Sequence, residues 1–145
     1  MQLKDQRVVL TGGASGIGAC ALEKFVAEGA AQIHVADRDS ARLAEVIKAL
    51  PADSPVVATE VDVSDRAALE HFIRSADAAM GGLDVLVNNA GIMSGAVDFP
   101  GTSLEAMNRV IDVNLVAMMI GTRLGIELMH QRGNLGIVLN TASIA

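Results

Sequence analysis

Three glycines near the start of the chain have the spacing of a phosphate-binding turn. The segment Thr11–Gly18 reads Thr-Gly-Gly-Ala-Ser-Gly-Ile-Gly, between a short apolar run and a helical pattern. Gly12 can adopt a positive φ, Gly16 lets a phosphate approach the backbone, and Gly18 permits close helix–strand packing. The following helix N-terminus adds free N–H groups and a positive dipole end. The residues expected to contact the phosphates are Gly12, Ser15, Gly16, Ile17 and Gly18.

An acidic residue stands at the tip of the next predicted strand. Asp37 lies 19 residues after Gly18 and directly follows the run Gln32–Ala36. A carboxylate at this point accepts hydrogen bonds from the ribose hydroxyls of an adenosine. Because it would repel a 2′-phosphate, the pattern favours NAD over NADP, and the adjacent Arg38 could soften that preference. A solvated loop carboxylate is the alternative reading, which the spacing disfavours.

The elements that must position these residues alternate between short apolar runs and longer helical patterns. Such alternation implies βαβ units and a parallel sheet, and strands without polar alternation fit a sheet covered on both faces. A long apolar helix is predicted from residue 103 to 130, opened by a capping box of Thr102 and Glu105. The predicted strands are Arg7–Thr11, Gln32–Ala36, Val56–Val61, Leu83–Asn88 and Gly136–Asn140.

These elements predict an α/β fold with a Rossmann-type, doubly wound parallel sheet in three α/β/α layers. Residues 1–145 are expected to form one dinucleotide-binding domain that stops after the fifth strand. The net charge of −6 and the lack of a Lys/Arg cluster argue against nucleic acid and anionic membranes as partners. The single cysteine, Cys20, and the absence of a visible secretory signal indicate a reducing, cytoplasmic setting. His34, His71 and His130 show no metal-ligand spacing, so no metal site is expected.

The glycine spacing, with three residues between Gly12 and Gly16 and one between Gly16 and Gly18, resembles the single-domain, NAD(P)-binding branch of the short-chain dehydrogenase/reductase family. Further motifs match that family in order along the chain. A weaker similarity around Asn114-Leu115-Val116 is to NAD-linked 15-hydroxyprostaglandin dehydrogenases. The resemblance implies further cofactor contacts at Asp62, Val63, Asn88, Asn89, Ala90, Gly91 and Val113. Helix capping by Asp62 and strand-end hydrogen bonding by Asn88 and Asn89 are the structural alternatives.

The resemblance also implies the reaction, a hydride transfer that interconverts a secondary alcohol and a ketone. Ser143 would hydrogen-bond the substrate oxygen, and Asn114 would hold a proton-relay water. In the family a tyrosine, followed four residues later by a lysine, moves the proton. The 145 residues contain no tyrosine, so we expect this polypeptide by itself to bind cofactor at best, without useful dehydrogenase activity.

Other functions fit parts of the same pattern. A non-catalytic, redox-sensing module would use the dinucleotide site but has little need for Asn114 and Ser143. A nucleotide-sugar epimerase is disfavoured by the glycine spacing. The family further implies a homodimer or homotetramer, with the long predicted helix in the interface, and a small alcohol or ketone as partner. Nothing in the sequence identifies that substrate.

Overall fold

Five parallel strands form one sheet in the computed structural model of the protein, which describes residues 3–93, 95 and 99–143. The strand order is β3-β2-β1-β4-β5, and every neighbouring pair is parallel. The chain thus builds the sheet from β1 in one direction and then from β4 in the other. This reversal confirms the doubly wound topology. The strands are β1 (Arg7–Thr11), β2 (Gln32–Asp37), β3 (Val56–Glu60), β4 (Val85–Asn88) and β5 (Ile137–Asn140).

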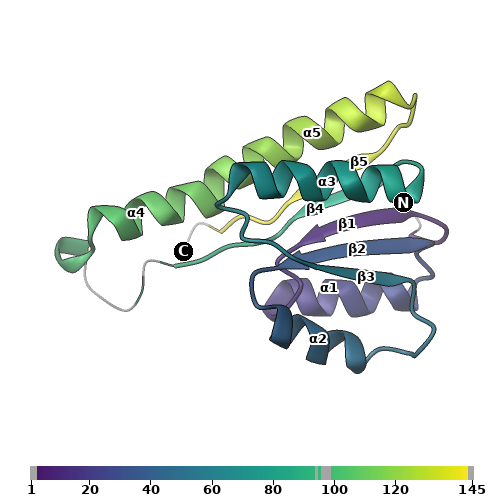
Figure 1. The fold of residues 1–145 in the computed structure, drawn as a ribbon, viewed down its shortest axis with the longest axis horizontal. Coiled ribbons are helices and arrows are strands. Elements are labelled where there is room, and N and C mark those ends of the chain that lie inside the picture. Colours follow the sequence, from purple (N-terminus) through teal and green to yellow (C-terminus); the bar gives the residue numbers. More distant parts are fainter. Residues whose placement is uncertain (1–2, 94, 96–98, 144–145) are drawn as a thin grey trace.

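Helices cover both faces of the sheet and complete three layers (Figure 1). Two helices, α1 (Gly16–Ala27) and α2 (Ser40–Lys48), pack on one face. On the other face lie α3 (Arg66–Met80) and α5 (Ala117–Gln131). The helix α4 (Leu104–Ile111) projects beyond the sheet, after the short 3-10 turn η1 (Phe99–Gly101).

The core divides into two apolar clusters because side chains alternate along each strand. Val8 and Leu10 of β1 face α1 and α2, whereas Val9 faces α3 and α5, and all three are fully buried. The edge strand β3 differs from this pattern, since Val57 is 42% exposed. The continuous apolar runs of the central strands therefore reflect burial on both faces, as the sequence predicts.

The predicted helix from residue 103 to 130 is interrupted, which corrects the sequence-based expectation. It comprises α4, the π-helical segment η2 (Asp112–Val116) and α5. A π-helical turn holds an extra residue, so it changes the direction in which the next side chains point. The capping residue also differs, because Ser103, rather than Thr102, accepts the N–H of Ala106 at 3.2 Å.

A buried histidine on β2 is expected to make the stability of the fold depend on pH. His34 on β2 is only 7% exposed, and its Nε2 has no hydrogen-bond partner among the described residues. Burial lowers the pKa of His34 below its ordinary value because it penalises the charged imidazolium. The folded state therefore binds this proton less readily than the unfolded chain does. The free energy of unfolding should therefore be unaffected by His34 above the pKa of the unfolded state, about 6.5. It should decrease as the pH falls below that value.

We expect a His34→Val variant to lose this dependence, because valine needs no proton and suits a buried strand. Each unit by which the folded pKa lies below the unfolded one corresponds to about 1.4 kcal/mol of stability lost in acid. Urea unfolding at pH 7.5 and pH 5.5 measures the difference for the wild type and the variant. A His71→Gln variant, changed at an exposed position on α3, should keep the wild-type difference. Equal pH dependence of wild type and His34→Val would show that His34 is not responsible.

Among the described residues, none of the helices combines the length and the apolar character needed to cross a bilayer. The same part of the chain holds no group of three or more His, Cys, Asp or Glu side chains arranged to bind a metal ion.

Candidate functional site

The glycine turn joins β1 to α1 and packs tightly on the end of β4. Gly12 has φ +74°, and a Cβ there would lie 2.7 Å from the Cα of Ala90. A Cβ at Gly18 would overlap the carbonyl oxygen of Gly12. Gly16 has φ +52° and faces open space. The turn thus requires glycine for two different reasons, a positive φ and the close approach of helix and strand.

The first turn of α1 presents hydrogen-bond donors to the same open space. Ser15 is the N-cap residue, yet its side chain makes no capping hydrogen bond. The amide N–H groups in the first turn of a helix have no carbonyl partner within that helix. Together with the dipole of α1 they favour an anion at this end.

Asp37 lies at the tip of β2 and is held by backbone amides. One of its carboxylate oxygens accepts the N–H of Ala14 at 2.9 Å, and the other accepts the N–H of Asp39 at 3.0 Å. The first bond ties the strand tip to the glycine turn. A carboxylate oxygen has two lone pairs, so both oxygens can still accept a further hydrogen bond.

The motif after β4 connects three strands at their carboxyl ends. The Asn89 amide donates to the carbonyl oxygens of Thr11, at 3.2 Å, and Gly12, at 2.9 Å. The buried Asn88 amide donates to Oδ1 of Asn140, the last residue of β5, at 2.8 Å. Asn88 is also close to Gly121 on α5, where a Cβ would overlap its side-chain oxygen. Asn88 therefore ties the sheet to α5, while Asn89 supports the glycine turn.

Asp62 follows β3 and joins two other segments. Its Oδ1 accepts the N–H and the hydroxyl of Ser64, at 3.0 and 2.7 Å, and its Oδ2 accepts Arg109 Nη2 at 2.7 Å. Partial burial alone would raise the pKa of Asp62, but the hydrogen bonds from Ser64 and the charge of Arg109 outweigh it and lower the pKa. The carboxylate is therefore kept ionised. Asp62 does not cap α3, since Asp65 accepts the first N–H groups of that helix.

Asn114 lies in η2 and pairs with the loop after β4. Its side-chain oxygen accepts the N–H of Ile92 at 2.9 Å, and its amide donates to the Ile92 carbonyl at 2.8 Å. Asn114 itself is exposed, so these two hydrogen bonds hold its side chain against the Ile92 backbone near the surface. Ser143 is also exposed, three residues after β5. Near it, Thr141 Oγ1 donates to Asn89 Oδ1 at 3.3 Å.

A cavity of about 410 Å³ opens at the carboxyl ends of the strands, where the sheet reverses direction. Its volume lies in the range of small-molecule sites. Twelve of the sequence-predicted contacts line it: Gly12, Ser15, Gly16, Ile17, Asp37, Arg38, Asp62, Val63, Asn89, Ala90, Gly91 and Val113. Gly18, Asn88, Asn114 and Ser143 do not line it. Gly18 and Asn88 instead shape the surrounding backbone.

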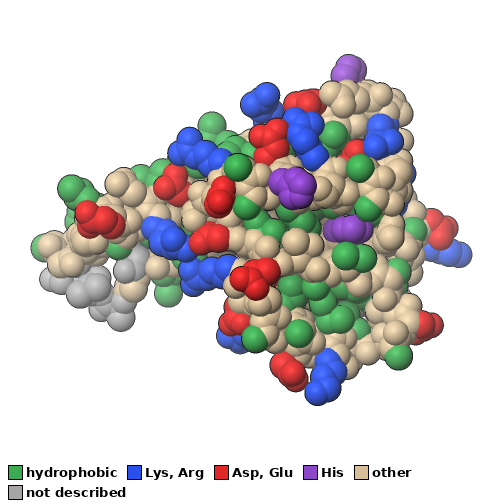
Figure 2. All heavy atoms as spheres, viewed as in Figure 1, with side chains coloured by type: hydrophobic (Ala, Val, Ile, Leu, Met, Phe, Trp, Pro, Cys, Tyr) green, Lys and Arg blue, Asp and Glu red, His purple; other side chains and the backbone are tan. Residues whose placement is uncertain are grey.

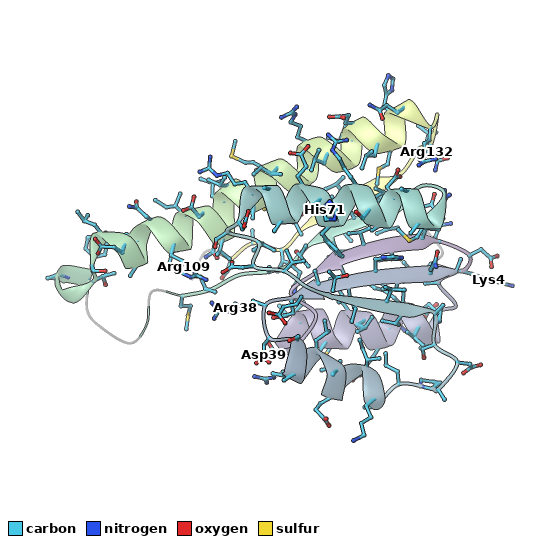
Figure 3. All side chains as sticks on the ribbon, viewed as in Figure 1. Lys4, Arg38, Asp39, His71, Arg109 and Arg132 are labelled. Carbon is cyan, nitrogen blue, oxygen red and sulfur yellow. The ribbon has the colours of Figure 1, made fainter. Side chains whose placement is uncertain are left out.

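Sequence reasoning missed six further lining residues, which are Ala14, Asp39, Arg42, Val61, Ile92 and Thr141. Five of them adjoin a predicted contact or lie one helical turn beyond it, and Thr141 directly follows β5. The rule that ligands bind at strand carboxyl ends could therefore have identified them. The cavity therefore carries mixed charge, since its lining includes Asp37, Asp39 and Asp62 as well as Arg38 and Arg42. Figure 3 shows Arg38 and Asp39 beside each other where β2 ends.

A doubly wound sheet with a cavity at its switch point is the architecture of nucleotide-binding α/β proteins. The short chain dehydrogenase family model matches residues 6–145. A 3β-hydroxysteroid dehydrogenase 2 of Eggerthella lenta is 35% identical over 144 residues, which are 99% of this chain and 55% of that protein. The chain therefore belongs to the short-chain dehydrogenase family.

Solved structures of the family show the same fold. A short-chain dehydrogenase/reductase from Burkholderia phymatum in complex with NAD matches with a TM-score of 0.91 and 28% identity, over 99% of this chain and 51% of that one. A short chain dehydrogenase from Burkholderia cenocepacia in complex with NADP matches with a TM-score of 0.86 and 28% identity. The match covers 99% of this chain and 58% of that one. This chain thus spans about half the length of the relatives it matches.

Proposed function

We propose that the protein is an NAD(H)-dependent oxidoreductase that interconverts a secondary alcohol and a ketone. The observation that carries the proposal is the joining of two binding features in one cavity. Asp37 accepts the N–H of Ala14, so the ribose-binding carboxylate and the phosphate-binding turn are held at a set separation. Family membership and the 3β-hydroxysteroid dehydrogenase among the relatives support the redox assignment.

The residues of the cavity fit a dinucleotide. The open space beside Gly16 leaves room for a pyrophosphate against the first N–H groups of α1. Asp37 keeps lone pairs available for both hydroxyls of a ribose. Val61, Val63 and Val113 are buried and supply apolar walls for a flat ring. The bound nicotinamide would supply hydride transfer at its C4 atom.

The chain's own residues would position the reactants. Ser143 would donate a hydrogen bond to the substrate oxygen, and Asn114 would hold the loop at Ile92 while ordering a water for proton relay. We assign turnover to the protein expressed from its complete reading frame, and only cofactor binding to residues 1–145 alone, which hold no tyrosine to move the proton. Turnover of a secondary alcohol also separates this proposal from a non-catalytic, redox-sensing module.

We further propose that NAD is preferred over NADP. The two solved relatives contain NAD in one case and NADP in the other, so the family alone does not decide. Asp37 places a negative charge where a 2′-phosphate would lie, whereas Arg38 and Arg42 line the same cavity and oppose that effect. The carboxylate should dominate because its position is fixed by Ala14 and Asp39, while both arginine side chains are exposed.

The proposal is tested by calorimetric titration of the protein, expressed from its complete reading frame, with NADH and NADPH. We expect NADH to bind about tenfold more tightly or better, the effect of one unfavourable charge contact at partial exposure. Tighter binding of NADPH would refute the role of Asp37. If neither NADH nor NADPH bound, the proposed function itself would be refuted.

An oligomeric, cytoplasmic protein fits the remaining surface. The outer side of the α4–η2–α5 helix exposes large apolar side chains, as expected for part of a homodimer or homotetramer interface. Cys20 is an exposed free thiol, which a reducing compartment would preserve. The exposed apolar residues of this helix are Leu104, Ile111, Leu115, Met119 and Ile126.

A further inference from the structure

The helix α4 projects from the body and has no buried residue, so apolar packing does little to hold it. Two ion pairs connect it and η2 to the segment after β3. Arg109 Nη2 lies 2.7 Å from Asp62 Oδ2, and Arg66 Nη2 lies 3.3 Å from Asp112 Oδ1. Figure 2 shows acidic and basic side chains gathered where the projecting part joins the body, and Figure 3 shows Arg109 on α4 there.

The two pairs differ in what they contact. Both pairs are partly exposed, with side chains 66% and 37% exposed for Arg66 and Asp112 and 45% and 39% for Arg109 and Asp62. What separates them is position, because Arg66 and Asp112 lie outside the cavity and serve only local attachment. Asp62, in contrast, lines the cavity beside the buried Val61 and Val63. Arg109 does not line the cavity but contacts Asp62. The second pair therefore affects a group that a ligand could touch.

The hydrogen bonds of Asp62 determine which of its lone pairs stay available. Ser64 occupies Oδ1 with two donors, and Arg109 occupies one side of Oδ2. One acceptor site on Oδ2 remains, on a carboxylate whose rotation is restricted from both ends. Beside it, the valine walls favour a flat aromatic ring. An anionic acceptor at the edge of such a slot suits a heterocycle that carries an amino group.

We propose that Arg109 is a positioning residue, which directs the free lone pair of Asp62 Oδ2 to the 6-amino group of an adenine ring. The inference rests on the proposed function, since the adenine belongs to the dinucleotide. Without Arg109, Asp62 would be held only at Oδ1 by Ser64, so Oδ2 could shift toward water and the charge-assisted hydrogen bond to the amino group would weaken. Arg109 thereby connects α4 to the adenine end of the cavity.

The test compares NAD with its hypoxanthine analogue, deamino-NAD, which has an oxygen in place of the 6-amino group. Dissociation constants are measured by calorimetry for the protein expressed from its complete reading frame. The wild type should prefer NAD by about tenfold, the lower end for a hydrogen bond to a charged group. Arg109→Met, which keeps the length of the side chain, should reduce the preference to twofold or less. Arg109→Gln, which can still donate but has no charge, should give an intermediate value.

Arg66→Met is the matched control, because it removes a charge at the same junction without touching Asp62. It should keep the wild-type preference. A ratio of two constants for the same protein is insensitive to the folded fraction, and Arg109→Gln serves if Arg109→Met does not fold. Retention of the full preference in Arg109→Met, or no preference in the wild type, would overturn the inference. Failure of the wild type to bind either dinucleotide would instead overturn the proposed function.

Discussion

An Asp37→Ala variant should bind NADH about tenfold to a hundredfold more weakly than the wild type and should no longer discriminate against NADPH. The loss corresponds to about one hydrogen bond between a ribose hydroxyl and a charged acceptor, worth about 1.5–3 kcal/mol. The change in selectivity has a second cause, since removal of the carboxylate leaves two arginines, Arg38 and Arg42, against one acidic residue, Asp39, at this end of the cavity. Calorimetric titration with both nucleotides measures both effects.

Two further variants separate the causes. Asp37→Asn keeps the shape and can still accept the N–H of Ala14, so it should restore part of the NADH affinity while NADPH binding stays improved. Glu45→Ala removes an exposed charge from α2 and should leave both constants within about twofold of the wild type, as expected for a screened surface charge. If Asp37→Ala kept the wild-type ratio of the dissociation constants for NADH and NADPH, the Asp37 carboxylate would not determine which of the two is preferred.

A Gly18→Ala variant should weaken NADH binding by about tenfold to a hundredfold and lower the melting temperature. The added Cβ would overlap the carbonyl oxygen of Gly12 and approach Asn89 Nδ2, so α1 must move away from the glycine turn. Overpacking of this kind costs about 1–3 kcal/mol. Because the N–H groups of α1 move with the helix, the cost appears in phosphate binding as well as in folding. Calorimetry and thermal unfolding followed by circular dichroism measure the two parts.

Cys20→Ala provides the control on the same helix, because Cys20 is exposed and alanine is a good helix former. It should leave both the affinity and the melting temperature close to those of the wild type. A Gly18→Ala protein with wild-type NADH affinity would show that the close approach of α1 and the turn is not needed for binding.

Local signals in the sequence identified the parts of the fold that depend on short-range physics. The apolar runs of β1 and β4 predict strands buried on both faces, and both are buried. A glycine at position 12 permits a positive φ in the turn, and Gly12 has one. Asp37 was placed at the tip of β2 from its spacing alone, and it lies there. Such features are predictable because backbone conformation and strand burial follow from residue type and periodicity.

The same reasoning failed where two distant segments meet. The apolar pattern from residue 103 to 130 predicts one continuous helix, but Asn114 pairs with the backbone of Ile92 and the chain forms a π-helical turn there. Nothing in the local pattern marks Ile92 as that partner. Likewise, no signal in the sequence indicates that Arg109 contacts Asp62, 47 residues earlier in the chain.

By itself, the sequence determined the family motifs, the order of the elements and the residue types at the cavity, since these depend on composition and spacing along the chain. Only the tertiary structure decided which groups form hydrogen bonds and ion pairs between distant segments, because such contacts depend on where two elements cross. The bond from Ala14 to Asp37 and the pair between Asp62 and Arg109 are of this second kind. A hydrogen bond requires placement to within a few tenths of an ångström, and that precision arises from packing.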